Sequence, residues 1–325
     1  MSLQNKIWNK IGIVKLIALA NKQRERRAGN SLYTCAIINA KSLPCSEDCK
    51  FCVFSKSSTA QVSLYPLKSK EEIKEKAEIS QRMGAMRFSI VITGRKASRK
   101  EIEKICEAIQ YIKREVKGIR LCASLGVVDR SELLLLKQAG LDRYHCNLET
   151  SERFFPYICR THTFADKLRT IEWAKEVGLE VCSGILMGMG EREDDRIEVA
   201  RTLNRLQVHG IPFNVLLPRQ GTPLASLSPV SLAEVLKTVS IFRLICKDKQ
   251  LILACRSTIK PELLPLLFMA GMNGLMIGDL LTIKGNPEQD RSLLERIEQI
   301  WKEETEEEKV FSLTRFLPSE QVVVA

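Results

Sequence analysis

Helical and strand-like segments alternate along this chain from residue 70 to residue 303, and this alternation restricts the fold more than any other feature. Apolar residues at helical spacing predict helices at 70–83, 98–116, 130–138, 164–177, 194–207, 231–246, 261–269 and 292–303. Short apolar runs between them predict strands at 86–92, 119–123, 142–146, 179–187, 212–216, 251–254 and 274–277. Repeated βα units without a change in composition are typical of a parallel sheet that curls into one TIM-type (β/α) barrel, so the predicted fold class is α/β.

The barrel is predicted to occupy residues 31–311. Residues 1–30 are expected to form an N-terminal helical extension on its outside, and residues 312–325 a C-terminal tail. With 325 residues, 45% of them hydrophobic and 27% charged, the chain has ample material for one large folded domain. No run of about 18 uncharged apolar residues is present, so neither a membrane span nor a secretory signal is expected, and the predicted location is the cytoplasm.

The net charge of +11 suits an acidic partner, which leaves nucleic acid, a membrane surface and an acidic protein open. The basic residues are interleaved with acidic ones on helix-like stretches such as 70–76. This pattern favours solvated helix faces over a basic stripe that follows a nucleic acid. We therefore expect neither a nucleic-acid partner nor a membrane partner.

Cys45, Cys49 and Cys52 share one short polar loop with the spacing C-x3-C-x2-C. Three thiolates this close can hold three irons of a four-iron, four-sulfur (4Fe-4S) cubane and leave the fourth iron open to another ligand. A structural zinc site would need a fourth protein ligand nearby. An odd total of eleven cysteines without an export signal also argues against a disulfide framework, and Cys35 and Cys255 are assigned no role.

This spacing, with the aromatic Phe51 directly before the last cysteine, resembles the radical S-adenosyl-L-methionine (SAM) superfamily. The resemblance implies that Cys45, Cys49 and Cys52 are the catalytic cluster ligands and that SAM chelates the open iron. An electron from the cluster then cleaves SAM to a 5′-deoxyadenosyl radical.

Further motifs narrow the resemblance to the biotin synthase family, over roughly residues 30–290. They lie in order at 37–42, 143–151, 181–184, 188–191, 221–224 and 278–282. The resemblance implies an enzyme that converts unactivated C–H bonds to C–S bonds, with sulfide from a sacrificed auxiliary iron–sulfur cluster and with dethiobiotin as the small-molecule substrate. It also implies a reducing flavodoxin or ferredoxin as electron donor and leaves a homodimer open.

The auxiliary cluster departs from the family's common pattern of three cysteines and one arginine. The first of those cysteines aligns with Ser89, and the arginine falls near Arg256 with a loose fit. Four other cysteines sit where strands or their following loops deliver side chains to a barrel interior, and they resemble a variant branch with an all-cysteine four-iron cluster. The predicted auxiliary ligands are Cys122, Cys146, Cys159 and Cys182.

The family pattern also assigns contacts to SAM and to the substrate. Lys167 aligns with a basic residue that pairs with the methionyl carboxylate. The four residues assigned to SAM are Phe51, Lys167, Gly188 and Glu191. Asn147 and Glu149 align with an asparagine and an aspartate that hydrogen-bond the ureido ring of dethiobiotin, and their alternation predicts that both point into the barrel's C-terminal end.

Three departures replace polar or small family residues by apolar ones, namely Phe54, Ile185 and Leu217. A pocket changed in this way suits an octanoyl chain about as well as a ureido ring, and the basic net charge suits an acidic lipoyl carrier protein. A lipoyl synthase component is therefore the second hypothesis. A non-catalytic iron–sulfur scaffold is a remoter one.

Overall fold

The structure is a computed structural model that describes residue 8, residues 10–281 and residues 283–314. Its strands are β1 (Tyr33–Lys41), β2 (Arg87–Ile92), β3 (Arg120–Ser124), β4 (Arg143–His145), β5 (Glu180–Cys182), β6 (Ile185–Met187), β7 (Gly210–Val215), β8 (Gln250–Cys255) and β9 (Gly274–Met276). Its helices are α2 (Ile13–Ala28), α3 (Lys70–Arg82), α4 (Arg99–Glu115), α5 (Arg130–Gln138), α6 (Phe155–Ile158), α7 (Phe164–Glu176), α8 (Glu193–Arg205), α9 (Leu232–Ile245), α10 (Pro265–Met269) and α11 (Pro287–Thr314).

The strands form one parallel sheet that closes on itself. Each strand from β1 to β4 pairs with the next, β7 pairs with β8, β8 with β9, and β9 with β1. Both β5 and β6 pair with β7, through Cys182 opposite Gly210 and Ile185 opposite Phe213. These two short strands therefore occupy a single strand position of the barrel, with a break between them. The predicted TIM-type (β/α) barrel is confirmed, and its strands end at one common rim where barrel active sites form.

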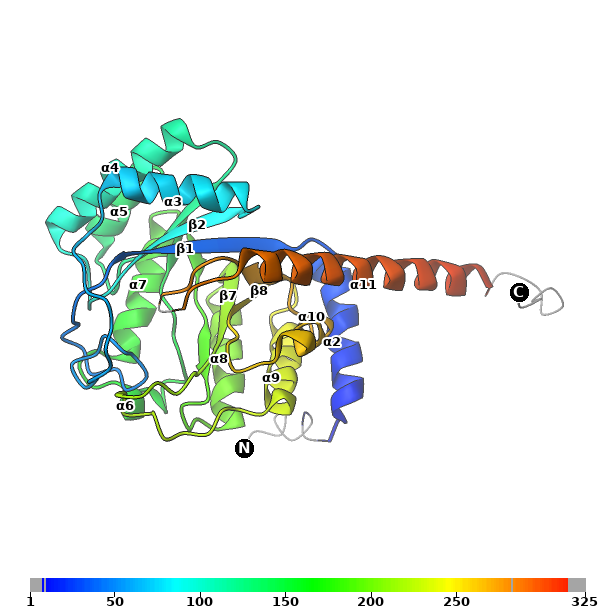
Figure 1. The fold of residues 1–325 in the computed structure, drawn as a ribbon. Coiled ribbons are helices and arrows are strands. Elements are labelled where there is room, and N and C mark those ends of the chain that lie inside the picture. Colours follow the sequence, from blue (N-terminus) through cyan, green and yellow to red (C-terminus); the bar gives the residue numbers. More distant parts are fainter. Residues whose placement is uncertain (1–7, 9, 282, 315–325) are drawn as a thin grey trace.

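The helices cover the outside of the barrel, as Figure 1 shows for α3 and α4 beside β1 and β2. Capping boxes at Ser69, Ser98, Asp129 and Thr163 start four of them, because each side chain accepts the backbone N–H three residues on. The helices α4 and α7 begin and end within one residue of the bounds that their apolar spacing predicts.

The N-terminal helix α2 packs against α9, where Leu16 and Ile241 belong to one buried cluster. At its other end the Arg24 guanidinium lies 4.0 Å from the centre of the Trp301 ring of α11. Helix α11 runs on to Thr314 and so crosses the predicted boundary at residue 311, while residues 315–325 of the predicted tail lie outside the described residues. The domain bounds stay predictions. Within the part of the chain that the structure describes, we find no helix long and apolar enough to cross a membrane.

Candidate active site

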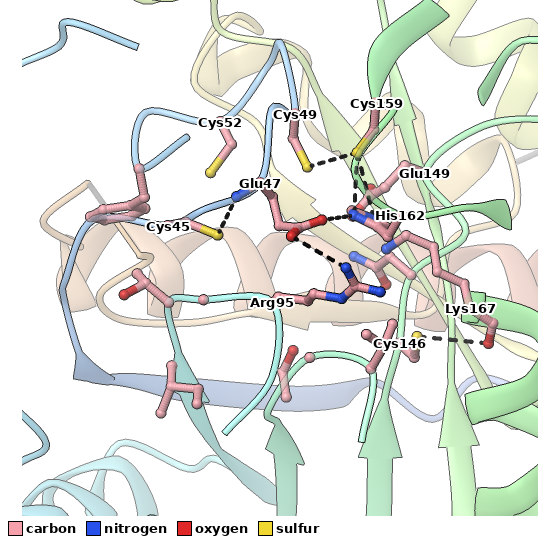
Figure 2. A pocket seen from close by; sticks show the side chains of 18 of the residues that line it. Cys45, Glu47, Cys49, Cys52, Arg95, Cys146, Glu149, Cys159, His162 and Lys167 are labelled. Atoms are coloured by element: carbon pink, nitrogen blue, oxygen red, sulfur yellow. Dashed lines mark hydrogen bonds and ion pairs between the residues drawn. The ribbon is translucent and has the colours of Figure 1, made fainter. Parts of the chain in front are cut away.

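The cysteine loop joins β1 to α3 and is fixed to the barrel at several points. Ser42 forms a bridge with Tyr65, and Cys45 donates its backbone N–H to the Phe54 carbonyl at 2.8 Å. Cys45, Cys49 and Cys52 all line a cavity of about 220 Å³ (Figure 2). The structure thus gives these three thiols one shared space, and their chemistry fits the predicted iron cluster.

Residues that follow β4 form the opposite wall of this cavity. Asn147 and Glu149 both line it, together with His145 and Cys146, and Lys167 reaches it from α7. These residues lie at or beyond the end of β4, so strand alternation does not account for their shared direction. Asn147 accepts the backbone N–H of Gly184 at 3.0 Å, which anchors it to the break between β5 and β6. Burial raises the pKa of Glu149, although the Lys167 ammonium opposes this shift.

Glu149 has a φ of 68°, in the left-handed region that a residue with a side chain seldom adopts. Its backbone is held there from both sides, because its N–H donates to the Gly184 carbonyl at 3.1 Å and its carbonyl accepts from Leu186 at 2.9 Å. Such a conformation costs about 1–3 kcal/mol and persists where the surroundings enforce it, often at functional sites. The strain therefore marks Glu149 as a functional candidate independently of the family pattern.

The turn after β6 holds the other two residues assigned to SAM, but outside the residues that line the cavity. The Glu191 carboxylate accepts the backbone N–H groups of Gly188 at 2.9 Å and Met189 at 2.8 Å, and Arg196 donates to it at 2.7 Å. Glu191 thus closes its own turn. The predicted contacts of Gly188 and Glu191 with SAM stay predictions.

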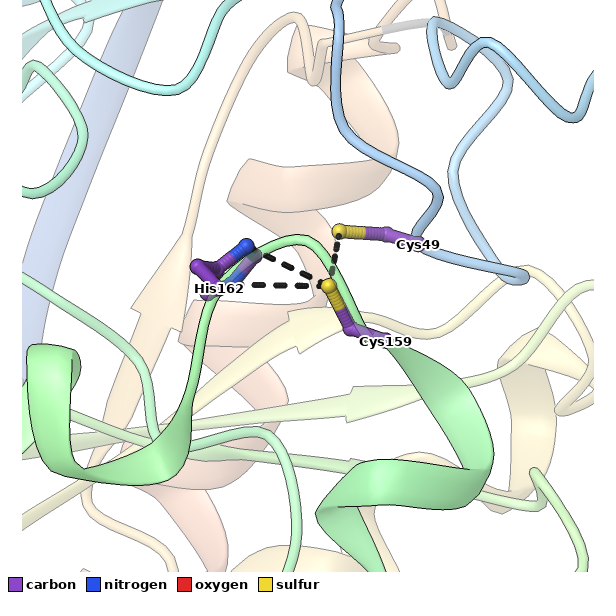
Figure 3. Close-up of side chains that lie close together, drawn as sticks. All are labelled: Cys49, Cys159 and His162. Carbon is purple, nitrogen blue, oxygen red and sulfur yellow. Dashed lines mark hydrogen bonds between the residues drawn. The ribbon is translucent and has the colours of Figure 1, made fainter.

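Cys159 lies directly beside the cysteine loop. Its sulfur is 3.6 Å from the Cys49 sulfur and 3.2 Å from His162 Nδ1 (Figures 2 and 3). The same sulfur is 3.2 Å from Asp48 Oδ1. The hydrogen bond from Cys49, together with those at His162 and Thr161, lowers the pKa of Cys159 to about 4 in the metal-free chain. Cys159 therefore belongs to the surroundings of the cysteine loop.

A second group of thiols is buried among the strands. Cys35 of β1, Cys122 of β3 and Cys182 of β5 lie close enough that each thiolate disfavours ionisation of another. Burial is the larger cause, and it raises the pKa of Cys35 and of Cys182 to about 12, while Arg143 and Arg87 act in the opposite direction. Three thiols and two guanidinium groups thus share the barrel interior.

This interior holds polar atoms that still lack partners. Arg87 uses Nη2 to bind Glu180 at 2.8 Å, but its Nη1 is buried without a hydrogen-bond partner among the described residues. The Ser89 hydroxyl is in the same state. Buried donors are normally satisfied, so unmet donors beside three thiols fit an anionic iron–sulfur group.

Of the four predicted auxiliary ligands, the structure brings together Cys122 and Cys182. Cys146 and Cys159 both line the cavity with the cysteine loop, and the Cys146 sulfur is 3.9 Å from the Lys167 carbonyl. Sequence analysis missed Cys35, because the predicted alternation begins at residue 70 and leaves out β1. Arg256, which falls near the family's arginine ligand, donates hydrogen bonds to the Asp290 carboxylate and to the Met276 carbonyl.

Comparisons with known proteins agree with this geometry. The model of the radical SAM superfamily matches residues 44–203, and that of the biotin and thiamin synthesis associated domain matches residues 212–299. The chain is 46% identical over 278 residues to a biotin synthase of Thermodesulfovibrio yellowstonii, covering 86% of this chain and 87% of the relative. It is 44% identical to a biotin synthase of Thermotoga neapolitana, covering 82% and 96%.

Among solved structures, methylornithine synthase has a TM-score of 0.77 at 21% identity, with 91% of each chain covered, which shows the shared fold. A HydG maturase of the FeFe-hydrogenase reaches 0.74 at 20% identity, covering 88% of this chain and 69% of the maturase. The fold, the cysteine loop and the relatives lead to one conclusion: the chain belongs to the biotin synthase family of the radical SAM superfamily.

Proposed function

We propose that this protein is a biotin synthase that inserts sulfur into dethiobiotin. The observation that carries the proposal is that one barrel holds two separate clusters of cysteines. One cluster lies in the loop above the strand ends, and the other lies among the strands. His145 connects them, because it lines the cavity and pairs in register with Cys182. Sulfur insertion needs a radical source and a sulfur source within reach of the same substrate, and this arrangement supports both.

Cys45, Cys49 and Cys52 would hold the 4Fe-4S cluster. When bound there, the cluster and SAM supply the chemistry that removes hydrogen from unactivated carbon. Lys167 brings a half-buried positive charge to the same cavity, which suits the methionyl carboxylate, and Phe51 adds an apolar face.

The auxiliary cluster would be held by Cys35, Cys122 and Cys182. Arg87 and Arg143 would balance its negative charge, and the unpartnered Arg87 Nη1 would find an acceptor there. The predicted set of Cys122, Cys146, Cys159 and Cys182 remains the rival assignment. Iron analysis of single variants separates the two sets.

The polar cavity wall supports a ureido substrate. Glu149 and Asn147 present a carboxylate and an amide to the cavity, which complement the N–H and C=O groups of a ureido ring. Burial and the nearby Arg143 and Arg87 lower the pKa of His145 to about 3, so its imidazole is neutral. Neutral polar groups of this kind suit an uncharged head group.

The rival octanoyl substrate rests on three apolar replacements. Phe54 does line the cavity, but Ile185 is fully buried in β6 and Leu217 lies outside the lining residues. Only one of the three therefore faces the reaction space. The lipoyl synthase hypothesis keeps the support of Phe54 and of the basic net charge.

The deciding experiment uses anaerobically reconstituted protein with SAM and a reductant. Incubation with dethiobiotin should yield biotin by mass spectrometry, whereas an octanoylated carrier peptide should gain no sulfur. A protein that releases 5′-deoxyadenosine but leaves dethiobiotin unchanged would refute the proposal. A protein that releases none would instead match a non-catalytic scaffold.

The reducing partner would be a flavodoxin or ferredoxin. Such proteins are acidic as a class, and the net charge of +11 complements them and speeds encounter. Free thiols and oxygen-sensitive clusters suit the reducing cytoplasm. Steady-state biotin formation should therefore fall steeply with added salt when flavodoxin, but not dithionite, supplies the electrons.

A further inference from the structure

A second cavity, of about 240 Å³, lies against the reaction cavity that the cysteine loop lines. Phe54 and Leu281 line both spaces, so these two apolar side chains form their common boundary. The second space, the rim cavity, is also lined by Asn39 near the end of β1 and by Arg219 after β7. A ligand that extends from one cavity into the other would therefore pass along an apolar wall.

Arg219 is held in place by contacts of its own backbone turn. Its carbonyl accepts the backbone N–H of Thr222 at 3.1 Å and the Thr222 hydroxyl at 2.8 Å. Thr59 of the cysteine loop donates its backbone N–H to the Gly221 carbonyl at 2.8 Å. A Cβ at Gly221 would lie 2.5 Å from the Ala60 nitrogen, so a glycine is needed where the two segments meet. The turn that carries Arg219 is thus fastened to the cysteine loop.

Of the described residues that line the rim cavity, Arg219 alone is charged. Its side chain is half-buried, and its guanidinium makes no hydrogen bond or ion pair with another described residue. The lysines of the adjoining groove differ, because Lys68 pairs with Glu72 at 3.2 Å and Lys76 pairs with Asp279 at 2.6 Å. The rim cavity is therefore positive and suits an anionic group.

The proposed substrate has the shape and chemistry to occupy both cavities. Dethiobiotin carries a ureido ring at one end and a carboxylate at the other, joined by an aliphatic arm. Glu149 lies in the reaction cavity, where it complements the ring (Figure 2). Phe54 and Leu281 offer an apolar surface to the arm. A guanidinium such as that of Arg219 pairs with a carboxylate through two parallel hydrogen bonds.

We propose that Arg219 is a substrate-binding residue that pairs with the carboxylate of dethiobiotin in the rim cavity and so selects the free acid. The inference rests on the proposed function. An octanoyl chain joined to a carrier protein has no free carboxylate to offer Arg219. The contact lies at the far end of the arm from the ring, so it stabilises the bound substrate and the transition state equally. It should therefore lower KM and leave kcat unchanged.

The test compares dethiobiotin with dethiobiotinol, a neutral analogue in which an alcohol replaces the carboxylate. Product formation by the reconstituted full-length enzyme is followed by mass spectrometry over a single turnover, at a series of substrate concentrations. Arg219→Leu should raise the half-saturating concentration of dethiobiotin about tenfold or more, with the maximal rate unchanged. The same variant should not change the half-saturating concentration of dethiobiotinol. Arg219→Lys keeps the charge and should recover part of the affinity for the acid.

Arg82→Leu is the matched control, because it removes the same charge from an exposed position in the last turn of α3. It should match the wild type with both substrates. Equal half-saturating concentrations of dethiobiotin in the wild type and in Arg219→Leu would overturn the inference. So would an equal rise for the acid and for the alcohol, because Arg219 would then act through the shape of the cavity. A wild type that makes no biotin would refute the proposed function, and the inference with it.

Discussion

Replacement of Cys35 by alanine tests the proposed sulfur source most directly. Cys35 is 5% exposed and lies with Cys182 and Ile252 in one buried cluster. Loss of one buried sulfur costs about 1 kcal/mol of folding free energy, against a total of about 5–15 kcal/mol. The variant should therefore fold. Its anaerobically reconstituted form should lose the auxiliary cluster and retain about four irons, those of the radical SAM cluster.

The cost of ionising these thiols adds a pH dependence to the same experiment. Burial raises the pKa of Cys35 and of Cys182 to about 12, so both thiols hold their protons at pH 7 and resist ionisation. Iron binding must overcome this cost and release the protons. Auxiliary-cluster assembly should therefore strengthen as the pH rises, and Cys35→Ala should abolish that dependence.

Cys246→Ala is the control for Cys35→Ala. Cys246 is another fully buried thiol whose pKa burial raises to about 12, and its sulfur contacts the Ala200 carbonyl at 3.4 Å, between α8 and α9. Its iron and sulfide content should equal that of the wild type. Full iron content in Cys35→Ala, with iron loss in Cys146→Ala, would refute the reasoning and favour the rival ligand set.

Three further predictions concern other parts of the site. Cys49→Ala should abolish release of 5′-deoxyadenosine, measured by chromatography, and any retained release would contradict its role as cluster ligand. Burial raises the pKa of Glu149, so its ionisation opposes folding as the pH rises. Glu149→Gln should therefore raise the Tm of the metal-free protein more at pH 8 than at pH 4. An equal rise in Tm at the two pH values, measured by scanning fluorimetry, would contradict this prediction. A Cβ at Gly210 would lie 2.9 Å from Arg143 Nη1 and 3.1 Å from the Cys182 sulfur. Gly210→Ala should therefore lower the free energy of unfolding in urea by about 1–3 kcal/mol. An unchanged urea midpoint would mean that these neighbouring side chains move aside without cost.

Sequence periodicity predicts the outer helices well because each one buries a single face. In α4, the fully buried residues Ile102, Ile105, Ile109 and Ile112 recur at helical spacing. The strand β1 shows no such period, since nearly every residue from Tyr33 to Lys41 is buried, and periodicity cannot reveal an element that is covered on both faces.

The break between β5 and β6 has a cause that lies far away in the sequence. A Cβ at Gly184 would come within 2.0 Å of the Pro212 carbonyl of β7, so the chain bends where this neighbour approaches closely. Residues 179–187 alone read as one continuous strand. Only the pairing of β7 with both pieces shows the break that anchors Asn147 and the strained Glu149.

The two sets of cysteines also differ in whether the sequence alone can identify them. The spacing of Cys45, Cys49 and Cys52 is local, so the sequence alone identifies them. Membership of the inner set depends on depth along the barrel axis: Cys35, Cys122 and Cys182 lie within strands, whereas Cys146 and Cys159 follow β4 and α6 and so reach the cavity at the rim. Depth is fixed by inter-strand register, which pairs Cys35 with Arg87 and Cys182 with His145. Because the register is set by the closed sheet, the sequence can only suggest candidate thiols for a second cluster. The strand register of the barrel determines which of these thiols lie close together.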